Sequence, residues 1–398
     1  MSSAGPLGAA ALAADYAEKL VVGTVREVHE AVAGRVHGAL DAAAGGAGLS
    51  HRVHDRIARG VYAGVGAGLR GAATGLRVAD RTAARAGVGR PLEDSRRGRA
   101  VLAAVNGFVG DRLREEAPDH YFDMAVRLDG RDVPLDDAGL RSSYPTATGE
   151  LVVFVHGLSE SEDHWERPVR PRRAEVVPGY GATLAAAGWS PVQVRVNTGL
   201  SLRENGAALA GLLDRLVGAW PAEVRRIALV GHSMGGLVVR AACAVRTDAE
   251  PPWTDLVTDV VTLGTPHLGA PLERVVHAGA RTLGRVPEAA PFGRILEFRS
   301  PGILDLRRGL APDVQNLPRA RYHLVAATLC RSPRSPLAET PGDLLVPYSS
   351  AIGRPRRGPE MFPGADVLHV PRADHFALLN HDTVHTALRA WLCREEDR

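Results

Sequence analysis

The stretch Ile227-Ala-Leu-Val-Gly-His-Ser233-Met-Gly-Gly236 decides the fold of this chain. Its apolar first half predicts a buried strand, and the residues from Met234 to Val245 predict a helix. A Gly-x-Ser-x-Gly sequence between a strand and a helix is typical of a sharp turn that exposes the serine hydroxyl at the edge of a sheet. A chance match in a glycine-rich chain is the alternative interpretation, and the strand and helix around the turn argue against it.

Strand-like and helix-like segments alternate on both sides of this turn. The expected strands span residues 151–155, 192–196, 227–230, 256–263, 322–329 and 367–370. The expected helices span residues 181–188, 202–217, 234–245 and 376–393. Residues 121–135 alternate around Asp129-Gly130, which predicts a hairpin. The whole pattern predicts an α/β fold, in which a mostly parallel sheet is flanked by helices on both faces.

The N-terminal part of the chain has a different pattern. Apolar residues recur there every three or four positions, as in amphipathic helices. The three stripes are Val21-Val25-Val28-Val32-Val36-Leu40, Val53-Ile57-Val61-Val65-Leu69 and Val101-Val105-Phe108-Leu113. We therefore expect a helical N-terminal region at residues 1–118 and an α/β domain at residues 119–398.

A segment at about residues 270–321 interrupts the alternation and is rich in Gly, Pro and Arg. We interpret it as an insertion over the carboxyl edge of the sheet, where a lid would lie. Its apolar residues either line a pocket or simply cover the sheet, and the sequence leaves both open. They are Leu272, Val275, Val276, Leu283, Ile295, Leu296 and Phe298.

Composition narrows the possible partners and compartments. The 398 residues are 45% hydrophobic and 23% charged, with a formal net charge of +3, and no nucleic-acid-binding signature accompanies the arginines. Three widely spaced cysteines argue against a disulfide framework. The first 20 residues lack the basic start of a secretion signal, and no apolar run reaches the roughly 18 residues of a membrane span. We expect a cytoplasmic protein and leave peripheral membrane contact and oligomeric state open.

A second functional turn is expected after the strand Leu151-Val-Val-Phe-Val155. It reads His156-Gly157-Leu158, and a turn there can aim backbone N–H groups at a developing oxyanion. We expect the N–H groups of Leu158 and Met234 to be the donors. His156 precedes the serine in sequence and is interpreted as a structural residue that orients the turn.

Four motifs together resemble a known family. They are His156-Gly157, the turn around Ser233, Leu263-Gly-Thr-Pro-His-Leu-Gly269 and Gly342-Asp343-Leu-Leu-Val-Pro-Tyr-Ser-Ser350. In this order they resemble bacterial lipases of the α/β-hydrolase fold, including lipases similar to the glycosylphosphatidylinositol inositol-deacylase group. The resemblance covers about residues 121–395. It implies a catalytic order of Ser, Asp, His and assigns the acid to Asp343, which matches the aspartate of the lipase Gly-Asp-x-x-Val-Pro pattern.

The acid and the base can also be sought from their positions. The acid has to follow a strand after the nucleophile and accept a hydrogen bond from the imidazole, as Asp343 would on the loop after residues 322–329. Asp305 and Asp313 fall in the irregular insertion, and Asp259 falls before or within a buried strand, so they are weaker candidates.

His375 is the expected base because it lies between the last strand and the terminal helix. His369 belongs to the strand itself, and His381 and His385 already belong to the helix. His267 is interpreted as part of a structural turn near the nucleophile.

The expected activity is serine-dependent hydrolysis of carboxylic esters, lipase- or esterase-like, through an acyl-enzyme on Ser233. The substrate would be an ester or a lipid, and neither a zinc-ligand spacing nor a phosphate-binding loop points to a metal or cofactor. Transfer of the acyl group to an alcohol by the same intermediate is an alternative. A lipid- or membrane-associated binding protein that works through its N-terminal helices is another.

The membrane alternative makes a testable prediction. Residues 51–100 carry 11 arginines against four acidic residues, and basic amphipathic helices lie on anionic membranes. If this region recruits the protein, a fragment of residues 1–118 floats with anionic vesicles at low salt and dissociates as salt rises, while neutral vesicles do not hold it. Failure to float with anionic vesicles at low salt would support helices packed as a small bundle.

Overall fold

A computed structural model of the chain describes residues 91–166, 178–246, 250–270, 300–310, 314–339 and 342–394, together with scattered residues between 7 and 85. The chain forms two compact units, Met1–Asp94 and Ser95–Arg398. The described residues at 73–79 of the first unit are helical, and the 3-10 helix η2 (Leu92–Asp94) ends that unit. The apolar stripes expected at residues 21–40 and 53–69 lie outside the described residues.

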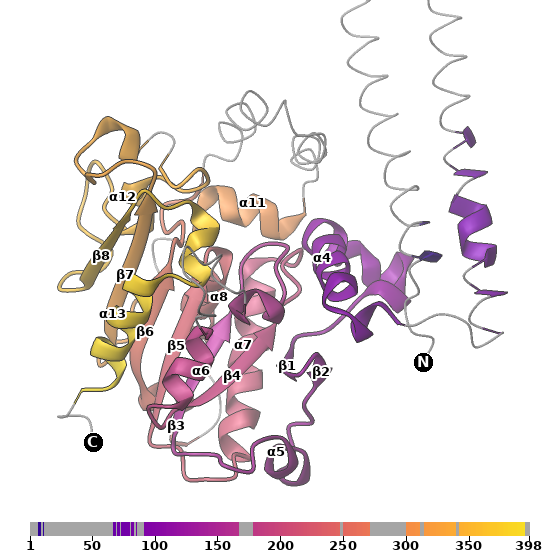
Figure 1. The fold of residues 1–398 in the computed structure, drawn as a ribbon, viewed down its shortest axis with the longest axis horizontal. Coiled ribbons are helices and arrows are strands. Elements are labelled where there is room, and N and C mark those ends of the chain that lie inside the picture. The colour runs from indigo at the N-terminus through magenta and orange to yellow at the C-terminus, as the bar shows by residue number, and fades with distance from the viewer. Residues whose placement is uncertain are drawn as a thin grey trace, which may run out of the picture. The chain divides into compact units, whose positions relative to one another are not determined.

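The second unit is built on one eight-stranded sheet with the order β2-β1-β4-β3-β5-β6-β7-β8 (Figure 1). Its strands are β1 (Ala125–Leu128), β2 (Arg131–Asp132), β3 (Glu150–Val155), β4 (Ser190–Arg195), β5 (Arg226–His232), β6 (Val257–Leu263), β7 (Arg321–Thr328) and β8 (Asp366–Pro371). The predicted hairpin is present as β1 and β2, and β1 also pairs antiparallel with β4. All other pairs are parallel, which confirms the α/β fold with a mostly parallel sheet.

Helices connect these strands near the expected positions. The α-helices are α4 (Arg96–Glu116), α5 (Asp137–Ser143), α6 (Tyr180–Ala185), α7 (Leu202–Gly218), α8 (Met234–Cys243), α11 (Pro301–Arg308), α12 (Tyr348–Ala351) and α13 (Asp382–Leu392). The 3-10 helices of this unit are η3 (Pro118–His120), η4 (Glu162–Glu166), η5 (Trp253–Leu256), η7 (Pro336–Ala338) and η8 (His375–Leu379).

The prediction of a single terminal helix at residues 376–393 was wrong, because the chain forms η8 and α13 instead. Asn380 and His381 between them have extended backbones. The His381 ring accepts a hydrogen bond of 3.2 Å from the backbone N–H of Thr383 and so begins a new helix.

Two apolar layers cover the two faces of the sheet. Along β3, Leu151, Val153 and Val155 belong to one buried cluster, which includes residues of α7 and α8. Val152 and Phe154 belong to the other cluster, which includes residues of α6 and α13. Neighbouring side chains of a strand point to opposite faces, so this strand is apolar throughout because both faces are buried.

Helix α4 lies in the second unit, although the sequence placed it before a boundary at residue 118. Its buried Asn106 amide binds other parts of that unit: Nδ2 donates to the His120 carbonyl at 2.7 Å, and Oδ1 accepts from Asn197 Nδ2 at 3.0 Å. Arg99 of α4 makes a bidentate ion pair with Asp163, with both N–O distances 2.7 Å. Because a buried amide needs such partners, α4 is part of the α/β unit.

The expected insertion at residues 270–321 is described only in part. Residues 271–299, which include all the apolar residues proposed for a pocket, lie outside the described residues. Helix α11 at the end of the segment is packed into the core through Ile303 and Leu306. Asp305 accepts a hydrogen bond of 2.9 Å from the backbone N–H of Leu202 at the start of α7. This end of the insertion is therefore a fixed part of the fold, and a lid formed by the rest stays a prediction.

The position of α4 predicts a difference between two residues on it. Leu113 is fully buried, whereas Val101 is 44% exposed. Truncation of a buried leucine costs about 2–5 kcal/mol. We therefore expect Leu113→Ala to lower the free energy of unfolding of the α/β unit by that amount in urea, and Val101→Ala to lower it much less. Equal effects of the two changes would show that α4 contributes little to the unit.

Candidate active site

Ser233 occupies a strained turn between β5 and α8. Its backbone has φ 53° and ψ −124°, a conformation that residues other than glycine rarely adopt. The turn is held by a hydrogen bond of 2.8 Å from the Ser233 N–H to the Leu263 carbonyl at the end of β6. A Cβ at Gly231 would lie 2.5 Å from the Gly236 Cα, and one at Gly235 would overlap the Val155 carbonyl. The glycines are therefore required because backbone lies in the space of a side chain.

His375 and Asp343 form a buried pair at the same edge of the sheet. Asp343 is on the loop after β7, and His375 begins η8 just after β8. The His375 Nδ1 lies 2.7 Å from Asp343 Oδ2, and the His375 backbone N–H donates to the Asp343 carbonyl at 3.0 Å. The other carboxylate oxygen accepts from the backbone N–H groups of Leu345 and Val346. These contacts fix the carboxylate of Asp343 in the position from which it orients the imidazole of His375.

This pairing controls the charge of the imidazole. Burial opposes protonation of His375, but the charge of Asp343 and its hydrogen bond outweigh burial and raise the pKa of His375 above its ordinary value. Its Nε2 is buried and has no hydrogen-bond partner among the described residues. An oriented imidazole with one nitrogen unused is able to accept a proton from a hydroxyl group.

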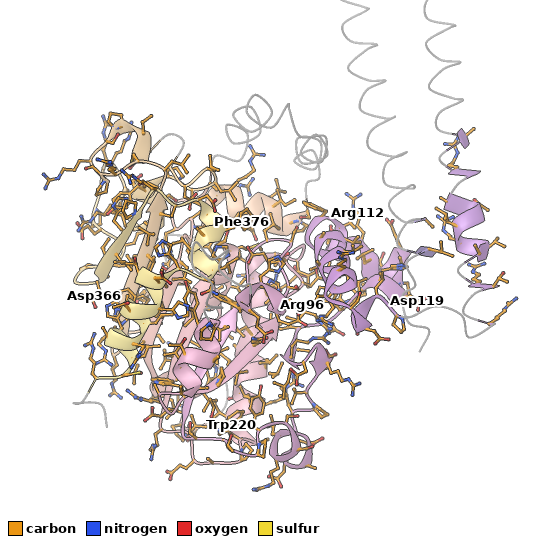
Figure 2. All side chains as sticks on the ribbon, in the orientation of Figure 1. Arg96, Arg112, Asp119, Trp220, Asp366 and Phe376 are labelled. Carbon is orange, nitrogen blue, oxygen red and sulfur yellow. The ribbon has the colours of Figure 1, made fainter. Side chains whose placement is uncertain are left out.

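The imidazole lies beside the serine turn. The ring centroids of His375 and His232, the residue before Ser233, are 4.7 Å apart. A Cβ placed on Gly264, directly after β6, would come within 3.1 Å of the His375 ring. Phe376, next to His375, lies at the end of the sheet opposite Trp220, which follows α7 (Figure 2). The structure thus brings Ser233, His375 and Asp343 to one edge of the sheet.

The turn after β3 packs against the same serine. A Cβ on Gly157 would lie 2.9 Å from the Ser233 Cβ. The Gly157 N–H donates to Glu160 Oε2, and the Ser159 N–H donates to Thr198 Oγ1. The Glu160 N–H donates to the Gly157 carbonyl. The N–H of Leu158 has no hydrogen-bond acceptor within the described part of the chain.

Met234 is the first residue of α8, where backbone N–H groups have no acceptor within the helix. The N–H groups of Leu158 and Met234 are therefore the candidates for holding an oxyanion. That role stays a prediction.

Two histidines near the site have structural partners. The His156 Nε2 accepts a hydrogen bond of 2.9 Å from the backbone N–H of Val196, and burial lowers the pKa of His156. The His267 Nε2 lies 3.2 Å from Thr262 Oγ1, and burial holds the pKa of His267 well below its ordinary value. Both imidazoles are buried and lie within hydrogen-bond distance of groups of the fold.

The other candidate acids and bases lie in different surroundings. His369 bonds to Thr328, and His385 lies against the ring of Tyr180. Asp259 is buried inside β6, where it binds Arg321 and His323. Asp305 accepts a hydrogen bond from the backbone N–H of Leu202, and Asp313 lies outside the described residues.

Sequence reasoning missed the pair of Glu160 and His232. Both side chains are buried, and the carboxylate lies 2.9 Å from the His232 Nδ1. Burial opposes ionisation of Glu160, but the charge and hydrogen bond of His232 outweigh it and lower the pKa of the carboxyl to about 2. A carboxylate so close to the His156-Gly157 turn was the one available signal.

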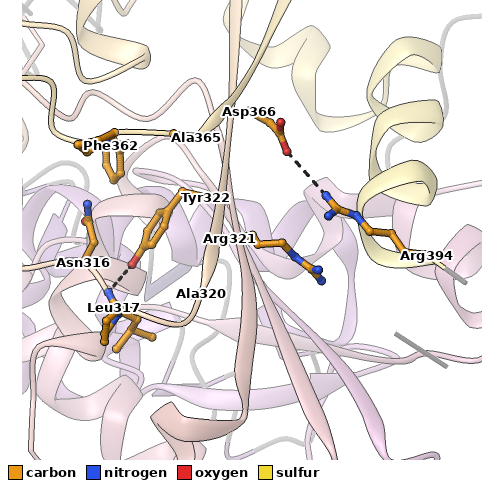
Figure 3. Close-up of a pocket in the computed structure, with 12 residues that line it drawn as sticks. Asn316, Leu317, Ala320, Arg321, Tyr322, Phe362, Ala365, Asp366 and Arg394 are labelled. Carbon is orange, nitrogen blue, oxygen red and sulfur yellow. Dashed lines mark hydrogen bonds and ion pairs between the residues drawn. The ribbon is translucent and has the colours of Figure 1, made fainter. Parts of the chain in front are cut away.

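A cavity of about 580 Å³ lies elsewhere, at the amino ends of β7 and β8 (Figure 3). Tyr322 in its wall accepts a hydrogen bond of 2.8 Å from the backbone N–H of Leu317, and Asp366 lies 3.8 Å from Arg394. Parallel sheets of this kind bind their ligands at the carboxyl ends of the strands. The cavity is therefore separate from the edge that carries Ser233.

Over the described ranges, no cluster of three His, Cys, Asp or Glu side chains is arranged to hold a metal ion. None of the helices in those ranges has the length and apolar character needed to cross a membrane.

Comparison with known proteins identifies a family. The model of the alpha/beta hydrolase family matches residues 152–387. A stretch of 97 residues is 41% identical to the "Probable esterase PIR7A" of Oryza sativa subsp. indica, and the same values hold for that of subsp. japonica. The match covers 24% of this chain and spans about a third (33%) of the length of those relatives.

Solved structures with a similar arrangement include a Bacillus licheniformis lipase, BlEst2, in mature form. It is 20% identical, with 61% of this chain and 91% of that chain covered and a TM-score of 0.40. The carboxylesterase CesB from Bacillus subtilis is 14% identical, with 62% and 84% covered and a TM-score of 0.35.

The Asp343–His375 pair predicts the titration of the imidazole. We expect NMR to show a pKa of His375 above 6.5, and Asp343→Asn to lower it because the charge that favours imidazolium is removed. The signal is assigned by its loss in His375→Gln. The same pKa in Asp343→Asn and in the unchanged protein would contradict the role given to the carboxylate.

Proposed function

Because the chain belongs to the alpha/beta hydrolase family, we propose that it is a serine-dependent carboxylic ester hydrolase of the lipase or esterase type. Ser233 is the proposed nucleophile, His375 the base and Asp343 its acid partner. One observation carries the proposal: a buried imidazole, bound by Asp343 at 2.7 Å and with Nε2 unused, lies beside the strained turn of Ser233.

The proposed reaction begins with proton transfer from the Ser233 hydroxyl to Nε2 of His375. The serine oxygen attacks the carbonyl carbon of an ester, and the N–H groups of Leu158 and Met234 hold the resulting oxyanion. The imidazolium then gives its proton to the departing alcohol, which leaves an acyl group on Ser233. Water, deprotonated by the same imidazole, attacks the acyl group, and the acid leaves as the serine hydroxyl is restored.

Asp343 supports this cycle without exchanging protons. Its hydrogen bond holds the proton of His375 on Nδ1, so Nε2 faces the reaction as an acceptor. The same contact stabilises the imidazolium that forms during each proton transfer. The two backbone N–H groups on its other oxygen keep the carboxylate from turning away.

Ester chemistry is also supported by the partial relatives, which carry an esterase name. The acyl-enzyme itself does not distinguish water from an alcohol as the second acceptor, so acyl transfer is separated from hydrolysis only by products. We propose water as the second acceptor and an ester, which includes lipid esters, as the substrate.

The proposal predicts which side chains are needed for turnover of p-nitrophenyl esters. We expect Ser233→Ala and His375→Ala each to lower kcat by about 10³-fold or more, and Asp343→Asn to cause a smaller but large loss. Ser233→Ala also abolishes labelling by a fluorophosphonate. Assays with an added alcohol, followed by product analysis, show whether acid or a new ester is released.

Two matched variants serve as controls for this experiment. His369→Ala and Asp305→Asn alter a histidine and an aspartate that lie outside the proposed site, and both should keep activity near normal. Near-normal turnover in Ser233→Ala or His375→Ala would reject the proposal. A greater loss of kcat in Asp305→Asn than in Asp343→Asn would assign the acid to Asp305.

A further inference from the structure

The carboxylate of Glu160 contacts two of the loops that surround Ser233. Its Oε2 accepts a hydrogen bond of 2.7 Å from the Gly157 N–H, at the start of the oxyanion turn. Its Oε1 lies 2.9 Å from the Nδ1 of His232, the residue before the nucleophile. Both side chains are almost fully buried, with exposed fractions of 4% for Glu160 and 0% for His232. A buried carboxylate with two such partners is strongly fixed.

His232 extends the connection to the base. Its Nε2 lies 3.2 Å from the backbone carbonyl of His375, and the two rings are in contact. The chain of contacts therefore runs from the Gly157 N–H through Glu160 and His232 to His375. It links the turn after β3, the turn after β5 and the loop after β8, which lie far apart in sequence.

We propose that Glu160 is a positioning residue, which holds the oxyanion turn and the base in register with Ser233 through its contacts with Gly157 and His232. The inference rests on the proposed function. Reaction rates depend steeply on such register, because a misplacement of about 1 Å costs on the order of 10²-fold. Packing alone would not require a charged side chain here, because an apolar residue fills buried space without the cost of burying a charge.

Glu160 also acts on the base through its charge. It is one of three carboxylates, with Asp343 and Asp374, that favour the protonated form of His375. The other titratable groups that face Glu160 are His232 on β5 and His164 on η4, and His156 at the end of β3 lies in its field. The variant Glu160→Gln leaves all of these in place and removes one negative charge.

The test compares Glu160→Gln with Asp163→Asn. The variant Asp163→Asn removes the same charge three residues further on, but Asp163 pairs with Arg96 and Arg99 of α4 and not with His232. We expect Glu160→Gln to lower kcat for a p-nitrophenyl ester by about 10- to 100-fold with little change in KM. We also expect the acid limb of kcat/KM to move to lower pH, because loss of the carboxylate lowers the pKa of His375. Asp163→Asn should leave both unchanged.

Fluorophosphonate titration counts the folded, reactive fraction, so that a loss of stability is not mistaken for a loss of rate. An unchanged kcat and acid limb in Glu160→Gln would overturn the inference. If the unchanged protein neither reacts with the probe nor hydrolyses esters, the proposed function fails instead. NMR titration of His375 then still tests Glu160. We expect Glu160→Gln to lower the pKa of His375, and an unchanged pKa in that variant would reject the role of Glu160.

Discussion

The left-handed backbone of Ser233 is the constraint on which the rest of the site depends. A backbone φ of 53° is unfavourable for a residue that has a side chain, and such strain persists only where surrounding contacts fix the chain. Here the Leu263 carbonyl holds the Ser233 N–H, and Gly231 and Gly235 let backbone approach where a Cβ would overlap it. In strand-to-helix turns of this kind the serine side chain stands clear of both the strand and the helix.

The parallel sheet determines which loops can meet at this turn. Strands β3, β5, β6, β7 and β8 all end at one edge, so short loops from distant parts of the sequence come together there. Burial at that edge then sets the chemistry. Burial alone would lower the pKa of His375, and the adjoining charge of Asp343 outweighs that effect and raises the pKa above its ordinary value. The cavity at the amino ends of β7 and β8 lies at the opposite end of the sheet (Figure 3).

Much of this arrangement could be predicted from sequence because the signals are local. Buried parallel strands are continuous apolar runs, and the turn at Ser233 needs its glycines within a few residues, so six strands and the strand-to-helix turn at Ser233 were recognisable. Position in the chain order, with the lipase-like motif for Asp343, singled out the two residues that the structure pairs, and their catalytic roles stay a prediction. The break of the terminal helix at Asn380 was missed because it depends on the cap that His381 supplies to α13.

The remaining features depend on contacts that no local pattern reveals. Glu160 and His232 are 72 positions apart, and only the parallel pairing of β3 with β5 brings them together. The placement of α4 likewise depends on Asn106 finding Asn197, which lies 91 positions further along. An apolar stripe predicts that a helix forms, but it does not say which surface the helix will cover.

The packing of α4 affects how this chain can be divided and recombined. Gly107 and Gly110 face Ser159 and Asn197, and Gly199 faces the Asn106 carbonyl, each so closely that a Cβ would overlap its neighbour. Helix α4 and these loops are thus closely packed against each other. A chain that began at the first strand would expose the Asn197 amide and leave Asp163 without Arg99. The boundary at which the N-terminal region can be removed without disturbing these contacts therefore lies between Asp94 and Ser95.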